Sequence, residues 1–460
     1  MAGATADLVE ICNSIEYESL PDSTIRATKK LVLDTLACSV GGYGAEPCEI
    51  VREYVKERGG DEATILGETD SVSIEGASLI NCTYARYLDI NDVYWSSAGD
   101  AGHPSGNIPL ALAVAEHEGA SGKELVEAIV GSYEAQLRLY EAPKVSTFTE
   151  VGWDHTSAAH ISSPIAAGML MGLDNEQLLN AVGIAGSSVV LGELRVGDIS
   201  MIKAPAFGFA AERGVEAAKL ARKGFTGPKK IIEGNRGYLQ MLAGGGNEAL
   251  FSEPPEEYLL EGACIKRYPA AYVMNTPIQT TLELVTENDI HPEEVESVHV
   301  ETFGWLLEDM VEGMGDTPRT HPENKETADH SLPYVTAVSI LDRELGLGQF
   351  TPERIASDDV REMMDRITFE QREEFEQYWP ESYPVTVTIQ TTDGETYDHH
   401  RKYATGDPRE PLSFDQIEEK FASLGDEVYS DERRKQIADV IRNLEELDDV
   451  SELLELFVTK

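Results

Sequence analysis

Two short stretches of the chain combine carboxylates with a histidine, the pairing that proton transfer needs. The first, residues 87–107, contains Asp89, Asp92 and His103 beside Gly and Pro. Asp89 and Asp92 share one helical face if the preceding helix continues through them. The His-Pro step ends regular structure, so the His103 ring is expected to project from a loop. A paired aspartate would fix the tautomer of the ring and raise its basicity. The alternative is that Asp92 caps a helix and His103 occupies an ordinary turn.

The second stretch, residues 152–156, places His155 beside an acid and before a run of small residues at helical spacing. The N-terminus of a helix favours a carboxylate, because unpaired N–H groups and the macrodipole both attract it. His155 therefore stands where an anionic ligand could bind. The alternative is a residue next to a helix cap with no chemical role. His160, which follows, is interpreted as structural.

Positive charge gathers in one region of a strongly acidic chain. The sequence has 37 Lys and Arg against 83 Asp and Glu, for a net charge of −46, yet residues 195–236 hold nine basic residues against four acidic ones. This reversal indicates a polyanionic ligand. Lys203 is the most suggestive member, since a lysine within an apolar run needs a partner. The other lysines of the stretch are interpreted as solvated charges: Lys219, Lys223, Lys229 and Lys230.

Three further polar residues are candidates for substrate binding or catalysis. Lys266 and Arg267 form a basic pair near an expected domain junction, and junctions commonly hold ligands. Tyr334 begins an apolar helix. Ordinary surface charge is the alternative for the pair, and core burial or capping is the alternative for Tyr334.

Hydrophobic periodicity predicts the elements that position these residues. Residues 1–260 are expected to form successive helices; within residues 125–142, for example, Val126, Ile129, Val130 and Tyr133 share one face. Gly and Pro then accumulate over residues 244–255 and interrupt any helix. Small residues such as Ala and Gly would let the helices approach closely.

Beyond that break, residues 295–303 and 383–403 alternate apolar and polar side chains with period two, and Asp393–Gly394 predicts a hairpin turn. The pattern returns to helix near the C-terminus. The fold class is therefore mainly α. We expect a large all-helical domain (1–260), a smaller α+β domain (261–404), and C-terminal helices (405–460) that return to the first domain.

Composition excludes several classes of protein. The negative charge would repel nucleic acid, and it is typical of a surface adapted to high salt. No apolar run approaches the roughly 20 residues of a membrane span, and the N-terminus lacks a basic region followed by an apolar one. We therefore expect a cytoplasmic protein. The five cysteines are scattered without a C-x-x-C pair, which predicts reduced, mostly buried thiols and no metal or iron–sulfur site.

Taken in order along nearly the whole chain, a set of motifs resembles the MmgE/PrpD family, which includes 2-methylcitrate dehydratase and cis-aconitate decarboxylase. The motifs include "LVLDTLACSVGGYG", "YLDINDVY", "GHPSGNIPLALAVAE", "KRYPA" and "HSLPYVTAVSIL". Two stretches, residues 152–168 and 192–215, are most similar to the 2-methylcitrate dehydratase branch.

The resemblance implies a homodimeric enzyme with its active site between a helical domain and an α+β lid. It places five residues at that site: Asp89, His103, His155, Lys203 and Lys266. Asp92, Arg267 and Tyr334 are added as substrate-binding candidates. A position that is threonine in the decarboxylase-like pattern is Val93 here, which argues against decarboxylation.

These residue types suit the dehydration of a tricarboxylate without a cofactor or metal. A base must take a proton from carbon, an acid must protonate the departing hydroxyl, and cations must stabilise the developing charge. The histidines and Asp89 could share the first two roles, and the lysines, with Arg267, could fill the third. The alternatives are a cis-aconitate decarboxylase, a related isomerase or epimerase, and a non-catalytic carboxylate-binding protein.

Overall fold

The computed structural model describes residues 3–147, 151–195, 200–242, 244–313 and 319–459. The chain divides into two compact units. Unit 1 comprises Met1–Leu194, Met201–Ile265 and Leu412–Lys460, and unit 2 comprises Arg195–Ser200 and Lys266–Pro411. The C-terminal segment thus belongs to the same unit as the N-terminal half. The fold is mainly α, as the helical periodicity predicted.

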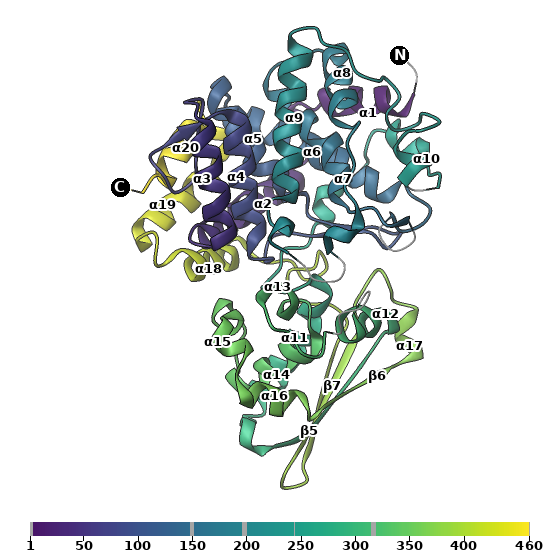
Figure 1. Ribbon diagram of the computed structural model, residues 1–460, viewed down its shortest axis with the longest axis vertical. Coiled ribbons are helices and arrows are strands. Elements are labelled where there is room, and N and C mark those ends of the chain that lie inside the picture. The colour runs from purple at the N-terminus through teal and green to yellow at the C-terminus, as the bar shows by residue number, and fades with distance from the viewer. Residues whose placement is uncertain (1–2, 148–150, 196–199, 243, 314–318, 460) are drawn as a thin grey trace. The chain divides into compact units, whose positions relative to one another are not determined.

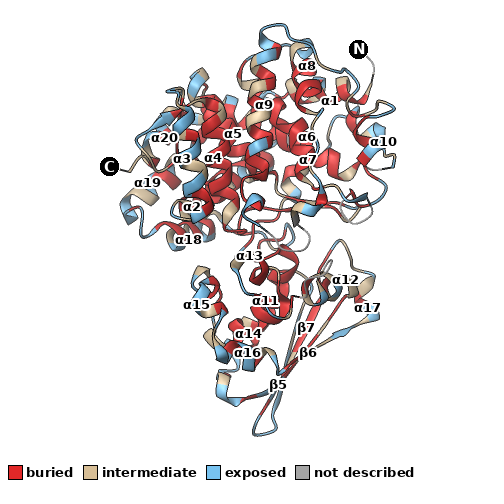
Figure 2. Cartoon of the chain, viewed as in Figure 1, coloured by how far each residue is buried: buried red, intermediate tan, exposed pale blue. Residues whose placement is uncertain are grey.

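Unit 1 is built mainly from helices. Its helices are α1 (Ala4–Asn13), α2 (Asp22–Gly42), α3 (Glu46–Arg58), α4 (Ile74–Tyr87), α5 (Asn107–Glu118), α6 (Gly122–Glu141), α7 (Thr156–Leu170), α8 (Asn175–Ala185), α9 (Ala206–Arg222), α10 (Tyr238–Leu242), α18 (Phe414–Gly425), α19 (Asp431–Arg442) and α20 (Ser451–Leu454). Two short antiparallel pairs accompany them: β1 (Ala63–Thr64) with β2 (Ser71–Val72), and β3 (Tyr94–Trp95) with β4 (Ala101–Gly102). Figure 2 shows buried residues concentrated in α4, α5, α6 and α7.

Helix α6 shows why the local pattern predicted this unit well. It begins after a capping box formed by Ser121 and Glu124, which satisfies the first free N–H groups. The four predicted core positions, Val126, Ile129, Val130 and Tyr133, are all buried. The amphipathic pattern therefore located both the helix and its buried face.

Small residues bring the helices of unit 1 close together. Helix α9 packs against both α4 and α7 (Figure 1). A Cβ atom on Gly208 would lie 2.6 Å from the carbonyl oxygen of Leu79 in α4, and one on Gly214 would lie 2.5 Å from Cβ of Ser163 in α7. Both distances are too short for any side chain, so glycine is required at each contact. The close approach expected from the small residues is confirmed.

Unit 2 is a mixed α+β structure around a four-stranded sheet. The strand order is β6 (Ile367–Gln371), β5 (Val295–Thr302), β7 (Val385–Thr391), β8 (Thr396–Arg401), with β5 and β6 parallel and the other pairs antiparallel. The helices are α11 (Tyr272–Glu287), α12 (Gly304–Leu307), α13 (Lys325–Ala328), α14 (Leu332–Asp342), α15 (Pro352–Ile355), α16 (Asp358–Met364) and α17 (Glu373–Glu376). Helix α11 packs against β7 and β8. The predicted turn joins β7 to β8, with Gly394 at φ 92°.

Two predictions about composition can be compared with the structure. All five cysteines are buried, as expected for reduced thiols in a core. Among the described residues, the helices are either too short or too polar to cross a membrane.

Candidate active site

The loop between α4 and β3 carries both aspartates of the first chemical stretch. Helix α4 ends at Tyr87, because Asp89 adopts a left-handed conformation with φ 56°. The Asp89 N–H donates to the carbonyl oxygen of Arg86 at 3.2 Å, which closes the last turn. The expectation that Asp89 and Asp92 share a helical face is therefore wrong: the helix ends before either residue, and their side chains meet different partners.

Asp89 is held between two cations. Its Oδ1 lies 2.9 Å from Nη1 of Arg86, and its Oδ2 lies 2.8 Å from Nζ of Lys203. All three side chains are buried. Lys203 ends a 3-10 turn (Met201–Lys203) just before α9, so the charge pair joins the loop after α4 to the start of α9. The sequence predicted that Lys203, in an apolar run, needs a partner, and Asp89 is such a partner.

Asp92 is buried among neutral donors. Its Oδ1 accepts from the Ser105 N–H at 3.1 Å, and its Oδ2 accepts from the Tyr133 hydroxyl at 2.9 Å. Burial raises the pKa of the Asp92 carboxyl to about 7, although the bonds from Ser105 and Tyr133 oppose that rise. The negative charge of Asp34 adds to it. Asp92 was predicted to bind substrate; in the structure both of its oxygens accept hydrogen bonds within unit 1.

His103 follows β4 and stands in a loop, as its His-Pro step predicted, with φ −112° and ψ 89°. Its Nδ1 lies 2.6 Å from the main-chain oxygen of Asp92. Because a carbonyl oxygen only accepts, Nδ1 must carry the hydrogen. The neutral ring therefore has its lone pair on Nε2 and can accept a proton there. The tautomer is thus set by the main chain of Asp92.

His155 precedes α7, so the expected helix N-terminus is confirmed. Its ring centroid lies 5.4 Å from that of His103, with the planes inclined at 67°. Asp154 accepts from the Thr156 N–H at 2.9 Å, so a carboxylate of the protein itself already occupies part of this helix terminus. The Tyr140 hydroxyl contacts the carbonyl oxygen of His155 at 3.3 Å. The structure therefore brings the two imidazoles of the separate stretches together.

His160 was interpreted from the sequence as a structural residue. It is buried in α7, its Nδ1 lies 3.3 Å from the Thr156 carbonyl oxygen, and burial lowers its pKa.

Several basic residues of the stretch around Lys203 form ion pairs with acidic side chains. Lys219 pairs with Glu75 at 2.9 Å, Arg222 with Glu118 at 2.7 Å, and Lys229 with Glu176 at 3.1 Å. Lys219 and Lys229, which were interpreted as solvated charges, are partly exposed in these pairs. Residues 196–199, which interrupt the stretch, lie outside the described residues.

Three predicted residues belong to unit 2. Lys266 begins the longer segment of unit 2, Lys266–Pro411, and is buried. Arg267 is exposed, with its guanidinium carbon 5.8 Å from the centroid of the Tyr268 ring. Tyr334 is fully buried in α14, where its hydroxyl donates to the carbonyl oxygen of Gln349. The core burial given as the alternative for Tyr334 is what the structure shows.

Sequence reasoning missed several residues that hold the site in place. Arg86 precedes Asp89 by three positions, a spacing that could have indicated the pair. Tyr133 was assigned to a core face, and its neighbours in the sequence do not indicate that its hydroxyl donates to Asp92. Asn91 was likewise missed; its amide nitrogen donates to the Ser105 hydroxyl at 2.9 Å.

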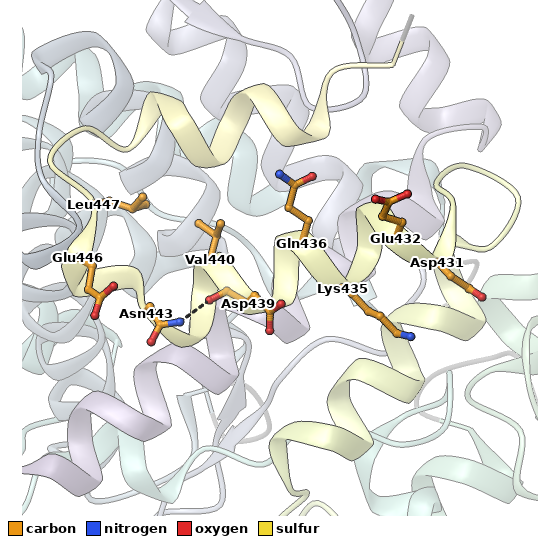
Figure 3. Close-up of a pocket in the computed structure, with 9 residues that line it drawn as sticks. All are labelled: Asp431, Glu432, Lys435, Gln436, Asp439, Val440, Asn443, Glu446 and Leu447. Carbon is orange, nitrogen blue, oxygen red and sulfur yellow. Dashed lines mark hydrogen bonds between the residues drawn. The ribbon is translucent and has the colours of Figure 1, made fainter.

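A groove runs along α19 (Figure 3), and none of these residues lines it. Its volume is about 970 Å³, and it is lined by Asp431, Glu432, Lys435, Gln436, Asp439, Val440, Asn443, Glu446 and Leu447. Four acidic side chains face a single lysine there. Such a lining would repel a carboxylate ligand, so the groove does not compete with the histidine pair as a site for one.

Comparison with known proteins bears on both units. Residues 6–250 match the MmgE/PrpD N-terminal domain, and residues 268–446 match the MmgE/PrpD C-terminal domain. The cis-aconitate decarboxylase of Homo sapiens is 25% identical over 98% of this chain and 94% of its own length. The 2-methylcitrate dehydratase of Salmonella typhimurium is 23% identical over 98% and 97%. The mitochondrial 2-methylcitrate dehydratase of Yarrowia lipolytica is 27% identical over 76% and 69%.

Proposed function

The chain belongs to the MmgE/PrpD family, whose relatives above are lyases, and on this premise we propose that it is a cofactor-independent dehydratase converting 2-methylcitrate to 2-methyl-cis-aconitate. The observation that carries the proposal is the pair of imidazoles of His103 and His155, whose ring centroids lie 5.4 Å apart. The loop that contacts His103 also carries Asp89, which pairs with the buried Lys203. The reaction requires a base, an acid and a fixed cation.

The proposed reaction removes a proton and a hydroxyl group from adjacent carbons. A base takes the proton from the carbon next to a carboxylate, the electron pair forms the double bond, and the hydroxyl leaves as water after an acid protonates it. His103 suits the role of base, because the main-chain oxygen of Asp92 holds the hydrogen on Nδ1 and so places the basic lone pair of the neutral ring on Nε2. We assign His155 as the acid. Lys203, held by Asp89, would stabilise negative charge on the substrate carboxylate as the proton leaves.

No step of this proposal requires a thiolate or a metal. Burial raises the pKa of Cys12 and of Cys48 to about 12, so these thiols would be poor ligands at neutral pH. Turnover is expected to survive dialysis against a chelator. Activity that is lost on chelation and restored by one added metal would overturn the metal-independent mechanism.

The second candidate is decarboxylation of cis-aconitate. The matched decarboxylases support it, since the human enzyme aligns over nearly the whole of both chains. In that reaction a carbon–carbon bond breaks, carbon dioxide leaves, and an acid protonates the carbon, so the same residues could serve. Val93, where the decarboxylase-like pattern has threonine, favours dehydration.

Absorbance at the ultraviolet band of a conjugated carboxylate separates the two reactions. Purified protein in molar salt with racemic 2-methylcitrate should show rising absorbance, and His103→Ala and Lys203→Ala should each abolish the rise. A flat trace together with release of carbon dioxide from cis-aconitate would assign the decarboxylase instead. Tricarboxylate binding with neither reaction would indicate a carboxylate-binding protein.

The proposed enzyme is a cytoplasmic, salt-adapted homodimer. Five large apolar side chains near the start of α9 and the loop before it are more than two-fifths exposed, which supports burial against a second copy: Val189, Leu191, Met201, Ile202 and Phe209. Light scattering of the purified chain in molar salt should give twice the mass of 50.4 kDa. Lys266 and Arg267 are retained as proposed carboxylate ligands, which substitution of each would test.

A further inference from the structure

Helix α18 sends one lysine into the core of unit 1, against the loop that carries Asp89 and Asp92. The side chain of Lys420 is 7% exposed, and its Nζ donates to Oδ1 of Asp34 at 2.5 Å and to the carbonyl oxygen of Ile90 at 2.6 Å. Asp34 lies in α2 and is fully buried. One ammonium group therefore joins three segments that are far apart in the sequence.

A buried lysine is costly, and packing alone does not require it. Both charges lose their hydration on folding, and an apolar pair of similar volume is often at least as stable in such a position. An apolar pair could not, however, donate to the Ile90 oxygen. That oxygen would otherwise be an acceptor in the core, and unmet buried acceptors are strongly disfavoured.

The rest of the loop is also held residue by residue. Before Ile90, Asp89 is bound by Arg86 and Lys203. After it, Asn91 donates to Ser105, and the Val93 N–H donates to the Cys264 carbonyl oxygen at 2.9 Å. Lys420 supplies the contact at Ile90, the peptide that lies between the two aspartates.

We propose that Lys420, held by Asp34, is a positioning residue that fixes the Ile90 peptide and thereby aims Asp89 at Lys203 and the Asp92 oxygen at His103. The effect on turnover rests on the proposed function; the effect on the loop does not. A displacement of the loop would move the Asp92 main-chain oxygen that fixes the His103 tautomer, and it would move Lys203 through Asp89. Small displacements of catalytic groups have large kinetic effects.

The test uses a matched control that shares helix α2 but has its partners after α18, in and just beyond α19. Lys29 also lies in α2, pairs with Glu445, and donates its Nζ to the Arg442 carbonyl oxygen at 2.7 Å. It thus makes the same kind of contact as Lys420 but away from the Asp89–Asp92 loop. The variants to compare are Lys420→Met with Asp34→Leu, and Lys29→Met with Glu445→Leu.

Two measurements on the whole chain in molar salt decide the matter. In the Lys420 double variant, amide hydrogen exchange of residues 89–95 should quicken on the order of tenfold. Turnover at saturating 2-methylcitrate should fall on the order of tenfold or more, with KM changed less than about twofold. The Lys29 double variant should leave both quantities at wild-type values, whatever its melting temperature.

Wild-type exchange at residues 89–95 in the folded Lys420 double variant would overturn the proposal. Faster exchange with unchanged turnover would overturn the link to catalysis. If wild-type protein shows no lyase activity, the proposed function fails, but the exchange comparison still tests the anchor. Should the double variant not fold, Lys420→Gln with Asp34→Asn replaces it: this neutral pair keeps polar groups at both positions, but the shorter glutamine withdraws the donor from the Ile90 oxygen. Normal exchange and turnover in that variant would also overturn the proposal.

Discussion

Asp89 and Asp92 lie three residues apart in one loop, yet the protein surrounds them in opposite ways. Asp89 is paired with Arg86 and Lys203, so two cations compensate its charge. Asp92 receives hydrogen bonds only from neutral groups among its named partners, Ser105 and Tyr133, and burial raises its pKa to about 7. Two identical side chains in one loop therefore lie in opposite electrostatic environments, one between cations and one among neutral donors.

The comparison separates two functions of a buried carboxylate. A carboxylate between cations holds those cations in place, and here it fixes Lys203, the group proposed to meet the substrate. A carboxylate among neutral donors costs stability whenever it is ionised, and its value lies in the geometry it organises. Asp92 organises His103 through its main-chain oxygen and Ser105 through its side chain.

Asp89→Asn should have the largest effect, because it removes the charge shared by Arg86 and Lys203. Loss of one partner from a buried ion pair costs about 3–5 kcal/mol of unfolding free energy. Turnover should fall on the order of 100- to 1000-fold as Lys203 loses its fixed position. Urea unfolding in molar salt and the ultraviolet assay measure the two effects. Wild-type turnover in a folded Asp89→Asn variant would show that the pair is structural only.

Asp92→Asn should instead change how stability depends on pH. Between pH 3.8, the ordinary pKa, and about 7, the folded wild type keeps its proton on Asp92 while the unfolded chain loses it, so wild-type stability falls as pH rises. At 1.36 kcal/mol for each pH unit, the interval corresponds to a loss of roughly 4 kcal/mol in unfolding free energy. This loss is complete above pH 7. Asparagine has no such dependence.

The stability of Asp92→Asn relative to wild type should therefore increase from pH 5 to pH 8, as measured by urea unfolding at fixed salt. Its turnover should fall less than that of Asp89→Asn, because the main-chain oxygen that holds His103 remains. A difference in stability that does not vary with pH would mean that Asp92 is already ionised throughout this range.

Tyr133→Phe sharpens the same comparison by removing one neutral donor from Asp92. The hydroxyl stabilises the ionised carboxylate, so its loss should raise the pKa of Asp92 further. The cost should be about 1–3 kcal/mol at pH 8, where Asp92 is ionised, and smaller at pH 5. Urea unfolding at a series of pH values should show that the loss of stability with rising pH ends at a higher pH in the variant than in wild type. An equal cost at both pH values would assign the effect to packing alone.

Local pattern predicted the elements but not the end of α4. Apolar–polar alternation in the sequence located β5, β7 and β8, and the Asp-Gly step located the turn between β7 and β8. Strand β6 was missed: it has five residues at the edge of the sheet, and only Ile367 of them is buried. The end of α4 at Tyr87 has no Gly or Pro to announce it, since the left-handed turn occurs at Asp89 itself.

The site residues divide in the same way. The sequence reveals histidines beside Gly and Pro and a lysine in an apolar run, because these residue types are unusual in those contexts. Tyr133 and Lys420 are not, because each looks like one position of an amphipathic helix. Their partners come from other elements, in the case of Lys420 and Asp34 from 386 residues away. Only the tertiary structure reveals that they hold the loop.

Lys219→Met should have the smallest effect, and it separates Lys203 from the rest of the basic stretch. Lys219 lies in the same stretch, but its pair with Glu75 at 2.9 Å leaves 24% and 15% of the two side chains exposed. Such pairs contribute about 0–1 kcal/mol, and molar salt screens them further. The unfolding free energy should change by less than about 1 kcal/mol, and turnover should stay at the wild-type value. A loss of turnover like that of Lys203→Ala would mean that the summed charge of the stretch attracts the substrate, and the contrast between buried and exposed cations would no longer explain the site.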